Sequence, residues 1–237
     1  MPRPIAITSI GFAFLLLQAC SGDWVKTQYA DYRGRYGDLD TGTIVAGLKE
    51  ALEQGTKRGV DALGRAGGYL DNARVRIPAP DELRKTDQLL RKVGAGRYAD
   101  QFIVSLNRAA EAAAPQATSV FIEVIRKMSI QDAVGILKGA DNAATRYFRR
   151  HSEAQLTAAF RPIVARATDR VGVTARYKQL LKAAGGVGVI DARGLDLDAY
   201  VTRMALDGLY LMIAQEEKRI RQDPVARTTE LLKKVFD

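Results

Sequence analysis

The chain has 237 residues, of which 47% are hydrophobic and 7 are proline, so it is long enough for one well-buried domain and too apolar for general disorder. It carries a formal net charge of +9 and contains one cysteine and one histidine. These counts exclude a disulfide framework and a cysteine- or histidine-rich metal site, and we expect neither a metal nor a cofactor. Windows rich in Ala, Leu, Arg and Glu predict an all-α fold.

Residues 1–19 have the features of a secretion signal. Arg3 supplies a positive charge, and the apolar stretch from Ile5 to Leu17 is shorter than the roughly 20 residues of a membrane span. The stretch leads into Leu17-Gln18-Ala19-Cys20, which resembles the signal of bacterial lipoproteins. That resemblance implies a diacylglyceryl group on the Cys20 thiol, cleavage before Cys20 and acylation of the new terminus. Gln18 departs from the usual small residue, and the alternatives are an ordinary cleaved signal or a chance cysteine.

Residues 20–40 are predicted to be a tether between the lipid and the domain. They combine glycines with aromatic and basic side chains, among them Trp24, Tyr29, Tyr32 and Tyr36. Aromatic rings beside basic residues suit a lipid interface. The alternative is a flexible leader that packs loosely on the domain, which spans residues 41–237.

The first helix is predicted over residues 41–63. Its apolar stripe repeats every three or four residues and includes two glycines: Ile44, Leu48, Leu52, Gly55, Gly59 and Leu63. Gly55 and Gly59 would allow another backbone to approach closely. Residues 74–80 follow as an extended segment, because a residue before proline avoids the helical region.

Several shorter helices are predicted next. Asp81 is expected to cap a helix ending at Gly94, and a second helix covers residues 97–114 until Pro115 breaks it. An apolar stripe follows over residues 120–128. Ser129 and Asp132 form a capping-box pattern that opens a helix closed at Gly139.

The pattern then predicts a two-turn helix over residues 142–150 and a new helix that Ser152 begins and Pro162 kinks. Another helix covers residues 173–181, and a glycine-rich loop covers 185–188. Asp223 and Pro224 are typical of a helix start, and a last short helix begins near Thr229.

The helix over residues 198–221 organises the prediction. It is apolar on nearly every face, so we expect other helices to enclose it in a single irregular multi-helix bundle. Asp207 interrupts the apolar run. Because an unpaired buried carboxylate is costly, we expect Asp207 to meet an arginine inside the domain, with Gly208 giving the partner helix room. The candidate partners are Arg108, Arg149, Arg150 and Arg161.

The charged residues near these helices suggest two alternatives. Arg108 and Glu111 lie together on one helix, and Arg146, Arg149 and Arg150 are spaced three and four apart on another. They could line an anion-binding cleft. Alternatively, they form ion pairs that tie short helices together, an interpretation favoured for an irregular helical domain.

Catalytic motifs are absent from the sequence. There is no Gly-x-Ser-x-Gly, phosphate-binding loop, His-Glu-x-x-His or Ser-x-x-Lys. Gly94-Ala95-Gly96 follows a predicted helix rather than a strand, so it lacks the context of a dinucleotide site. His151 is predicted to lie on the surface.

Several short sequence segments resemble those of one protein family. They are Arg76-Ile77-Pro78, the run from Asn107 to Pro115, Tyr147-Phe148-Arg149-Arg150, Ala205-Leu206-Asp207-Gly208-Leu209 and the run from Ala226 to Phe236. The family is a set of Gram-negative bacterial proteins catalogued as domain of unknown function 4197. The resemblance covers most of residues 41–237. It implies an exported helical protein, often with a lipoprotein signal, and assigns no catalytic residues.

Taken together, the sequence predicts a lipid-anchored envelope protein that binds a protein or an anionic envelope component without catalysis. Its membrane contact is the acyl chains on Cys20, and Ser21 favours the periplasmic face of the outer membrane. Nucleic acid is not an expected partner, because no aromatic–basic reading motif is present. The oligomeric state is not predicted. The alternative is an enzyme that uses Glu111 and Asp207 as acid and base in one pocket.

Overall fold

The computed structural model describes residues 40–185, 195–226 and 228–236. Within these ranges every regular element is helical, which confirms the all-α prediction. The predictions for the signal, Cys20 and the tether to Leu39 lie outside the described residues, as does most of the 185–188 loop. Residues 40–237 group into one compact unit by their contacts.

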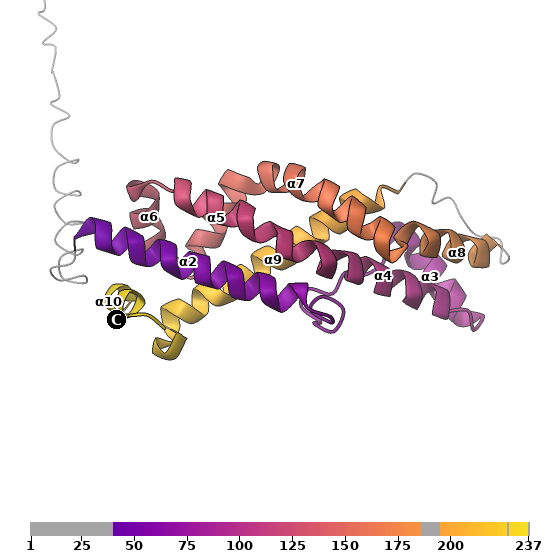
Figure 1. Cartoon of the computed structure of the whole chain (residues 1–237). Coiled ribbons are helices and arrows are strands. Elements are labelled where there is room, and N and C mark those ends of the chain that lie inside the picture. Colours follow the sequence, from indigo (N-terminus) through magenta and orange to yellow (C-terminus); the bar gives the residue numbers. More distant parts are fainter. Residues whose placement is uncertain (1–39, 186–194, 227, 237) are drawn as a thin grey trace, which may run out of the picture. The chain divides into compact units, whose positions relative to one another are not determined.

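The described elements follow the chain order shown in Figure 1. They are α2 (Thr41–Gly64), η1 (Asp81–Leu83), α3 (Arg84–Lys92), α4 (Arg97–Ala113), η2 (Ala114–Gln116), α5 (Ala117–Lys127), α6 (Ile130–Leu137), α7 (Ala143–Val171), α8 (Val173–Gly185), α9 (Leu197–Gln222), η3 (Pro224–Ala226) and α10 (Glu230–Phe236).

Helix α9 is the centre of the bundle, as predicted. It packs extensively on α7 and α2 and more briefly on α4, and Figure 1 shows it crossing obliquely beside α2. Its inward side chains are almost fully buried: Val201, Ala205, Leu206, Leu209, Tyr210, Ile213 and Ile220. The hydrophobic effect therefore holds the bundle together along this helix.

The predicted close approach at the α2 glycines is confirmed. A Cβ placed on Gly59 would lie 3.5 Å from the Cβ of Met212, and one placed on Gly55 would lie 3.4 Å from the Cβ of Glu216. Met212 and Glu216 both belong to α9. The two glycines thus bring the backbone of α2 against α9.

The prediction of two helices across residues 142–171 is wrong. Helix α7 runs through both Ser152 and Pro162 as one element of 29 residues. Ser152 does not cap a helix; it is buried, and its hydroxyl donates to the carbonyl of Phe148 one turn earlier. Because the Ser152 hydroxyl bonds to a carbonyl inside the helix, it does not offer the backbone a competing hydrogen bond that would end the helix there.

Other helix boundaries test the capping predictions. Ser129 accepts from the backbone N–H of Asp132, and the Asp132 carboxylate accepts from that of Ser129, so the capping box is confirmed. Pro115 ends α4 in the short turn η2, as predicted. Asp81, by contrast, does not cap the helix after it; its carboxylate pairs with Arg84.

The prediction that α9 is enclosed on every face needs correction. Met204, Asp207, Leu211 and Ala214 are spaced three and four apart, so they share one face of the helix. Leu211 is 39% exposed, and the other three are partly exposed. This stripe of α9 is open to solvent, and it leads to the candidate site.

Candidate functional site

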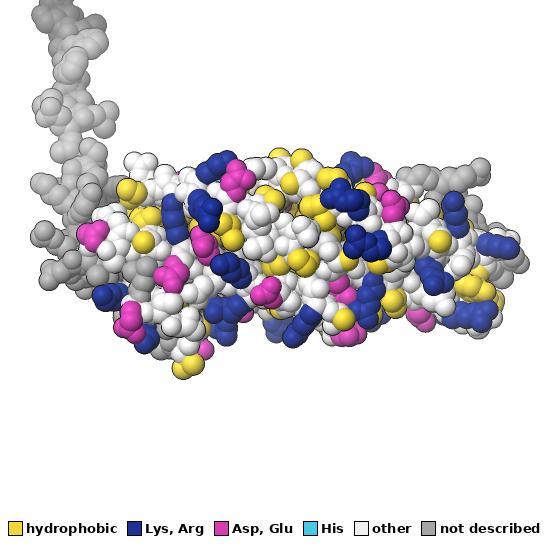
Figure 2. Space-filling view, viewed as in Figure 1, with side chains coloured by type: hydrophobic (Ala, Val, Ile, Leu, Met, Phe, Trp, Pro, Cys, Tyr) yellow, Lys and Arg dark blue, Asp and Glu magenta, His cyan; other side chains and the backbone are white. Residues whose placement is uncertain are grey.

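Basic side chains are spread over the surface. Figure 2 shows Lys and Arg along the described helices, with acidic side chains among them. Charge alone therefore does not locate a site. A cavity lined by several cations without partners is the more specific signal.

The turn and extended segment that follow α2 place two arginines beside α9. Arg74 and Val75 lie in a turn, in which the N–H groups of Val75 and Arg76 donate to the Asn72 carbonyl at 3.1 and 2.9 Å, so the predicted extended segment begins at residue 76 and not at 74. Val75 and Ile77 are buried, while Arg74 and Arg76 are exposed. Asn107 of α4 holds the segment: its amide accepts from the Ile77 N–H and donates to the Ile77 carbonyl, each at 2.8 Å. The two arginines therefore project from a fixed backbone.

The turn before this segment is fixed by buried polar groups. Glu111 accepts from the backbone N–H groups of Tyr69 and Leu70 at 3.2 and 3.1 Å. The Tyr69 hydroxyl donates to the carbonyl of Ala205 on α9 at 2.7 Å. Burial, with a smaller effect of the nearby Glu111 charge, raises the pKa of Tyr69 far above its ordinary value, so the phenol stays protonated and donating.

Gly208 explains how close the turn comes to α9. A Cβ there would lie 2.8 Å from a ring carbon of Tyr69 and 3.3 Å from the Cβ of Val75. The predicted room beside Asp207 therefore exists. It accommodates the 69–75 segment and not the helix that carries the arginine partner.

The arginine cleft lies between this segment, the start of α7 and the open face of α9. Its volume is about 430 Å³. Its lining residues are Arg74, Val75, Arg76, Asn142, Thr145, Arg146, Arg149, Met204, Asp207, Gly208, Tyr210, Leu211 and Ala214. Four arginines thus surround a mainly apolar floor that holds a single carboxylate.

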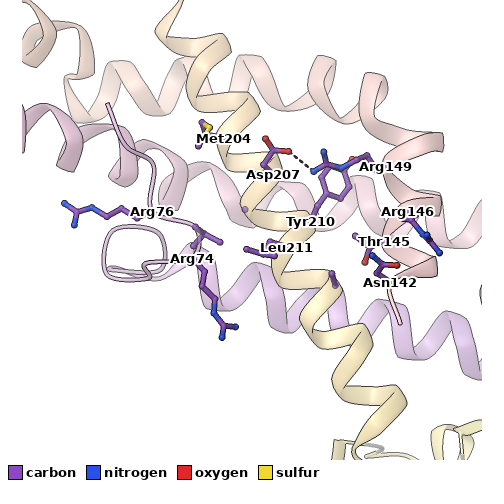
Figure 3. Close-up of a pocket in the computed structure, with 13 residues that line it drawn as sticks. Arg74, Arg76, Asn142, Thr145, Arg146, Arg149, Met204, Asp207, Tyr210 and Leu211 are labelled. Atoms are coloured by element: carbon purple, nitrogen blue, oxygen red, sulfur yellow. Dashed lines mark hydrogen bonds and ion pairs between the residues drawn. The ribbon is translucent and has the colours of Figure 1, made fainter. Parts of the chain in front are cut away.

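Three of these arginines have no side-chain partner among the described residues. Arg74, Arg76 and Arg146 are exposed, and their guanidinium groups make no ion pair or hydrogen bond within that part of the chain. Figure 3 shows Arg76 and Arg146 on opposite sides of α9 with their guanidinium ends pointing outward. They flank the cleft with uncompensated positive charge.

Arg149 is held in place, unlike the other three. Its Nη2 donates to Oδ1 of Asp207 at 2.6 Å, and its guanidinium lies over the Tyr210 ring, 4.6 Å from the centroid (Figure 3). Burial raises the pKa of Tyr210, so this ring remains uncharged beneath the cation. Since a guanidinium has five N–H donors and one is used, the remaining donors are available to a ligand.

The structure gives Asp207 an arginine partner, but the expectation of a buried pair is corrected. The side chains of Arg149 and Asp207 are 45% and 43% exposed. Asp207 lies inside an apolar stretch of sequence yet on a face of α9 that other helices leave open. A pair this exposed contributes little stability.

The remaining predicted site residues lie elsewhere. Arg108 pairs with the buried Glu111 on α4 at 2.6 Å, and Arg161 pairs with Asp196 just before α9. Arg150 is exposed and has no partner among the described residues. His151 is also exposed, as predicted, with the Tyr147 ring 4.3 Å away. Of the charged residues singled out from the sequence, Arg146, Arg149 and Asp207 line the arginine cleft, and the others do not.

The two carboxylates proposed as acid and base lie in different places. Glu111 borders a cavity of about 660 Å³ that α4 lines together with Val171 and Arg176, whereas Asp207 borders the arginine cleft. Glu111 is already engaged by two backbone N–H groups and Arg108. Neither cavity combines the two carboxylates. In the part of the chain that the structure describes, no group of three His, Cys, Asp or Glu side chains could hold a metal ion.

Sequence reasoning did not single out Arg74, Arg76 or Leu211 as site residues. For the arginines the predicted extended segment was only a partial signal, because Arg74 lies in a turn that the alternation of an extended backbone does not describe. For Leu211, the signal was its spacing of four from Asp207 on the same helix.

Comparison with known proteins identifies the family. No helix in residues 40–185, 195–226 and 228–236 is long and apolar enough to cross a membrane. Neither curated proteins nor solved structures give a match to the chain. Residues 38–237 match the family described as "Protein of unknown function (DUF4197)". This match covers most of the sequence and agrees with the resemblance of the short segments noted above. The chain therefore belongs to the DUF4197 family.

Proposed function

We propose that the protein is a lipid-anchored envelope protein whose helical domain binds an anionic ligand at the arginine cleft, without catalysing a reaction. The observation that carries the binding proposal is the set of cations around the cleft: Arg74, Arg76 and Arg146 lack partners among the described residues, and Arg149 is oriented by Tyr210 and Asp207. Arginine suits this role because its fork of donors matches phosphate and carboxylate oxygens.

The anchoring part of the proposal rests on the sequence. The apolar stretch before Leu17-Gln18-Ala19-Cys20 supports export and lipidation of Cys20, and Ser21 supports the periplasmic face of the outer membrane as the address. An anchor would hold the basic domain near anionic lipids and envelope proteins, where electrostatic attraction raises their local concentration.

The binding proposal is tested by titrating pyrophosphate into the lipidated full chain in phosphatidylcholine nanodiscs. The variant replaces Arg74, Arg76 and Arg146 together by Gln. A matched control replaces three exposed lysines away from the cleft, Lys85, Lys92 and Lys178, by Gln, which removes the same charge. We expect the cleft variant to lose about tenfold or more in affinity and the control to change less, because close charges dominate over screened distant ones.

Equal losses in the two triple variants would mean that pyrophosphate responds to net charge alone, and the cleft would not be the site. Absence of binding by the wild type would remove the proposal altogether. Calorimetry at two salt concentrations separates a weak site from none, because phosphate contacts with arginine weaken as salt rises.

A further inference from the structure

We infer that the ligand of the arginine cleft is a phosphate-bearing amphiphile, whose phosphate displaces Asp207 from Arg149 and whose apolar arm lies along Leu211. This inference rests on the proposed function and specifies the ligand class. It joins two features of one cleft: cations around the opening and an apolar floor.

The floor is larger and more apolar than a free phosphate ion requires. Leu211 is 39% exposed, and Met204 and Ala214 extend the same stripe along α9. Val75 borders it from the facing segment. A cleft of about 430 Å³ falls within the range of small-molecule pockets. An apolar arm laid on this floor would remove the exposed leucine from water, which is favourable in proportion to the area covered.

The Arg149–Asp207 contact is suited to exchange. It is a single N–H to oxygen contact at 2.6 Å, and both side chains are nearly half exposed, so water can replace either partner. The Tyr210 ring keeps the guanidinium in place when Asp207 leaves, because the stacking contact does not involve the carboxylate. Asp207 therefore acts as a built-in counter-ion for Arg149.

This counter-ion favours phosphate over carboxylate. A phosphate monoester carries a charge of about −1.5 to −2 near neutral pH and three acceptor oxygens. It can pair with Arg149 in two-point geometry and still attract Arg74, Arg76 or Arg146. A ligand with one carboxylate offers no more charge than Asp207 does, so it has little advantage in the exchange.

An acidic peptide fits the floor less well than a lipid-like arm does. Peptide backbone N–H and C=O groups need partners when they are buried. The stripe of Met204, Leu211 and Ala214 presents apolar side chains instead. The observations therefore favour an alkyl or acyl arm.

The test compares soluble probes on the lipidated full chain in phosphatidylcholine nanodiscs. Methyl phosphate supplies the head alone, hexyl phosphate adds an arm, and heptanoate keeps an arm but carries a carboxylate. We expect hexyl phosphate to bind about tenfold or more tightly than methyl phosphate, since each buried methylene adds to the affinity. Heptanoate should bind more weakly than hexyl phosphate.

Three variants locate the effect. Leu211→Gln should lower the affinity for hexyl phosphate much more than that for methyl phosphate, and so reduce the preference between them. Val104→Gln is its matched control, because Val104 is 38% exposed but borders the separate cavity at α4. Asp207→Asn should tighten the binding of both phosphates severalfold, because the competing charge is gone.

The outcomes separate the alternatives. Equal binding of methyl and hexyl phosphate would overturn the amphiphile and point to free phosphate groups. Tighter binding of a tetra-aspartate peptide than of hexyl phosphate would overturn it in favour of a protein partner. If Asp207→Asn weakens phosphate binding, the displacement is wrong. If no anionic probe binds, including pyrophosphate, the proposed function itself fails.

Discussion

Glu217 on α9 accepts hydrogen bonds from Thr145 at the start of α7, from its backbone N–H at 3.1 Å and from its hydroxyl at 3.0 Å. The same carboxylate accepts from the Ala144 N–H at 2.9 Å and pairs with Arg221 at 3.0 Å. Arg221 in turn donates to the carbonyls of Ile136 and Leu137 at the end of α6. One pair on α9 thus satisfies both the N-terminus of α7 and the C-terminus of α6 with charges of the favourable sign.

Glu217→Ala should destabilise the domain strongly. The carboxylate is buried, and its loss leaves two α7 N–H groups and Arg221 without this acceptor, at a cost of about 3–5 kcal/mol. Chemical denaturation measures the change in the free energy of unfolding. The control is Glu123→Ala, which removes an exposed pair with Lys127 and should leave the midpoint nearly unchanged. Equal shifts in the two variants would contradict the capping role.

Gly208→Ala should also destabilise the domain, by about 1–3 kcal/mol, because overpacking against fully buried Tyr69 forces the turn away from α9. The opposite sign is expected for Gly135→Ala. A Cβ at Gly135 meets nothing within 4 Å, so helix propensity should stabilise α6 by up to about 1 kcal/mol. The melting temperatures of the two variants test these two predictions. A Gly208→Ala protein as stable as the wild type would show that the contact between Gly208 and Tyr69 is loose.

Tyr69 predicts a loss of stability at alkaline pH. Its folded pKa is raised above the ordinary value of 10.0, first by burial and then by Glu111. Above that value the unfolded chain loses the phenolic proton while the folded chain keeps it, so the stabilising effect is full below about pH 10 and declines as pH rises.

Tyr69→Phe should cost about 1 kcal/mol at pH 7, because the hydrogen bond to Ala205 is lost. It should also reduce the decline in stability between pH 9 and about pH 11. Urea denaturation at several pH values measures both effects. The control is Tyr98→Phe at a partly exposed position. A pH profile identical to that of the wild type would show that Tyr69 does not ionise on unfolding in this range.

Asp207→Asn should change stability little. The Arg149–Asp207 pair is nearly half exposed, so its contribution is about 0–1 kcal/mol, in contrast to the 3–5 kcal/mol typical of a buried pair. Thermal unfolding of the single variant measures the effect. A loss of several kcal/mol would mean that the pair is closed to water in solution.

Cys20→Ser tests the proposed anchor. An acylated cysteine with several chains makes dissociation from the membrane negligible, whereas a chain without acyl groups should appear as a soluble or unprocessed product. Fractionation of membranes and periplasm, followed by mass spectrometry of the N-terminal peptide, checks the prediction. Recovery of the wild-type protein entirely in the soluble fraction would contradict it.

Local patterns in the sequence determined the helical class, the central position of α9 and the approach of α2 to it. The reason is that a period of three to four residues decides which face of a helix is apolar, as in the stripe from Ile44 to Leu63. The capping box at Ser129 and Asp132 was equally predictable, since both partners lie within one turn. Ser152 failed as a cap because the same hydroxyl can also be satisfied inside a helix.

The tertiary structure alone decided which groups meet over long distances. Arg149 and Asp207 are 58 positions apart, and their contact depends on how α7 crosses α9. The same crossing leaves the Asp207 face open, although the surrounding sequence is apolar. The cleft forms where this face meets Arg74 and Arg76, whose segment is fixed by Asn107 and Tyr69 through hydrogen bonds spanning 30 and 136 positions. Periodicity determines a helix's apolar face, but only the packing of several helices determines which part of it stays uncovered.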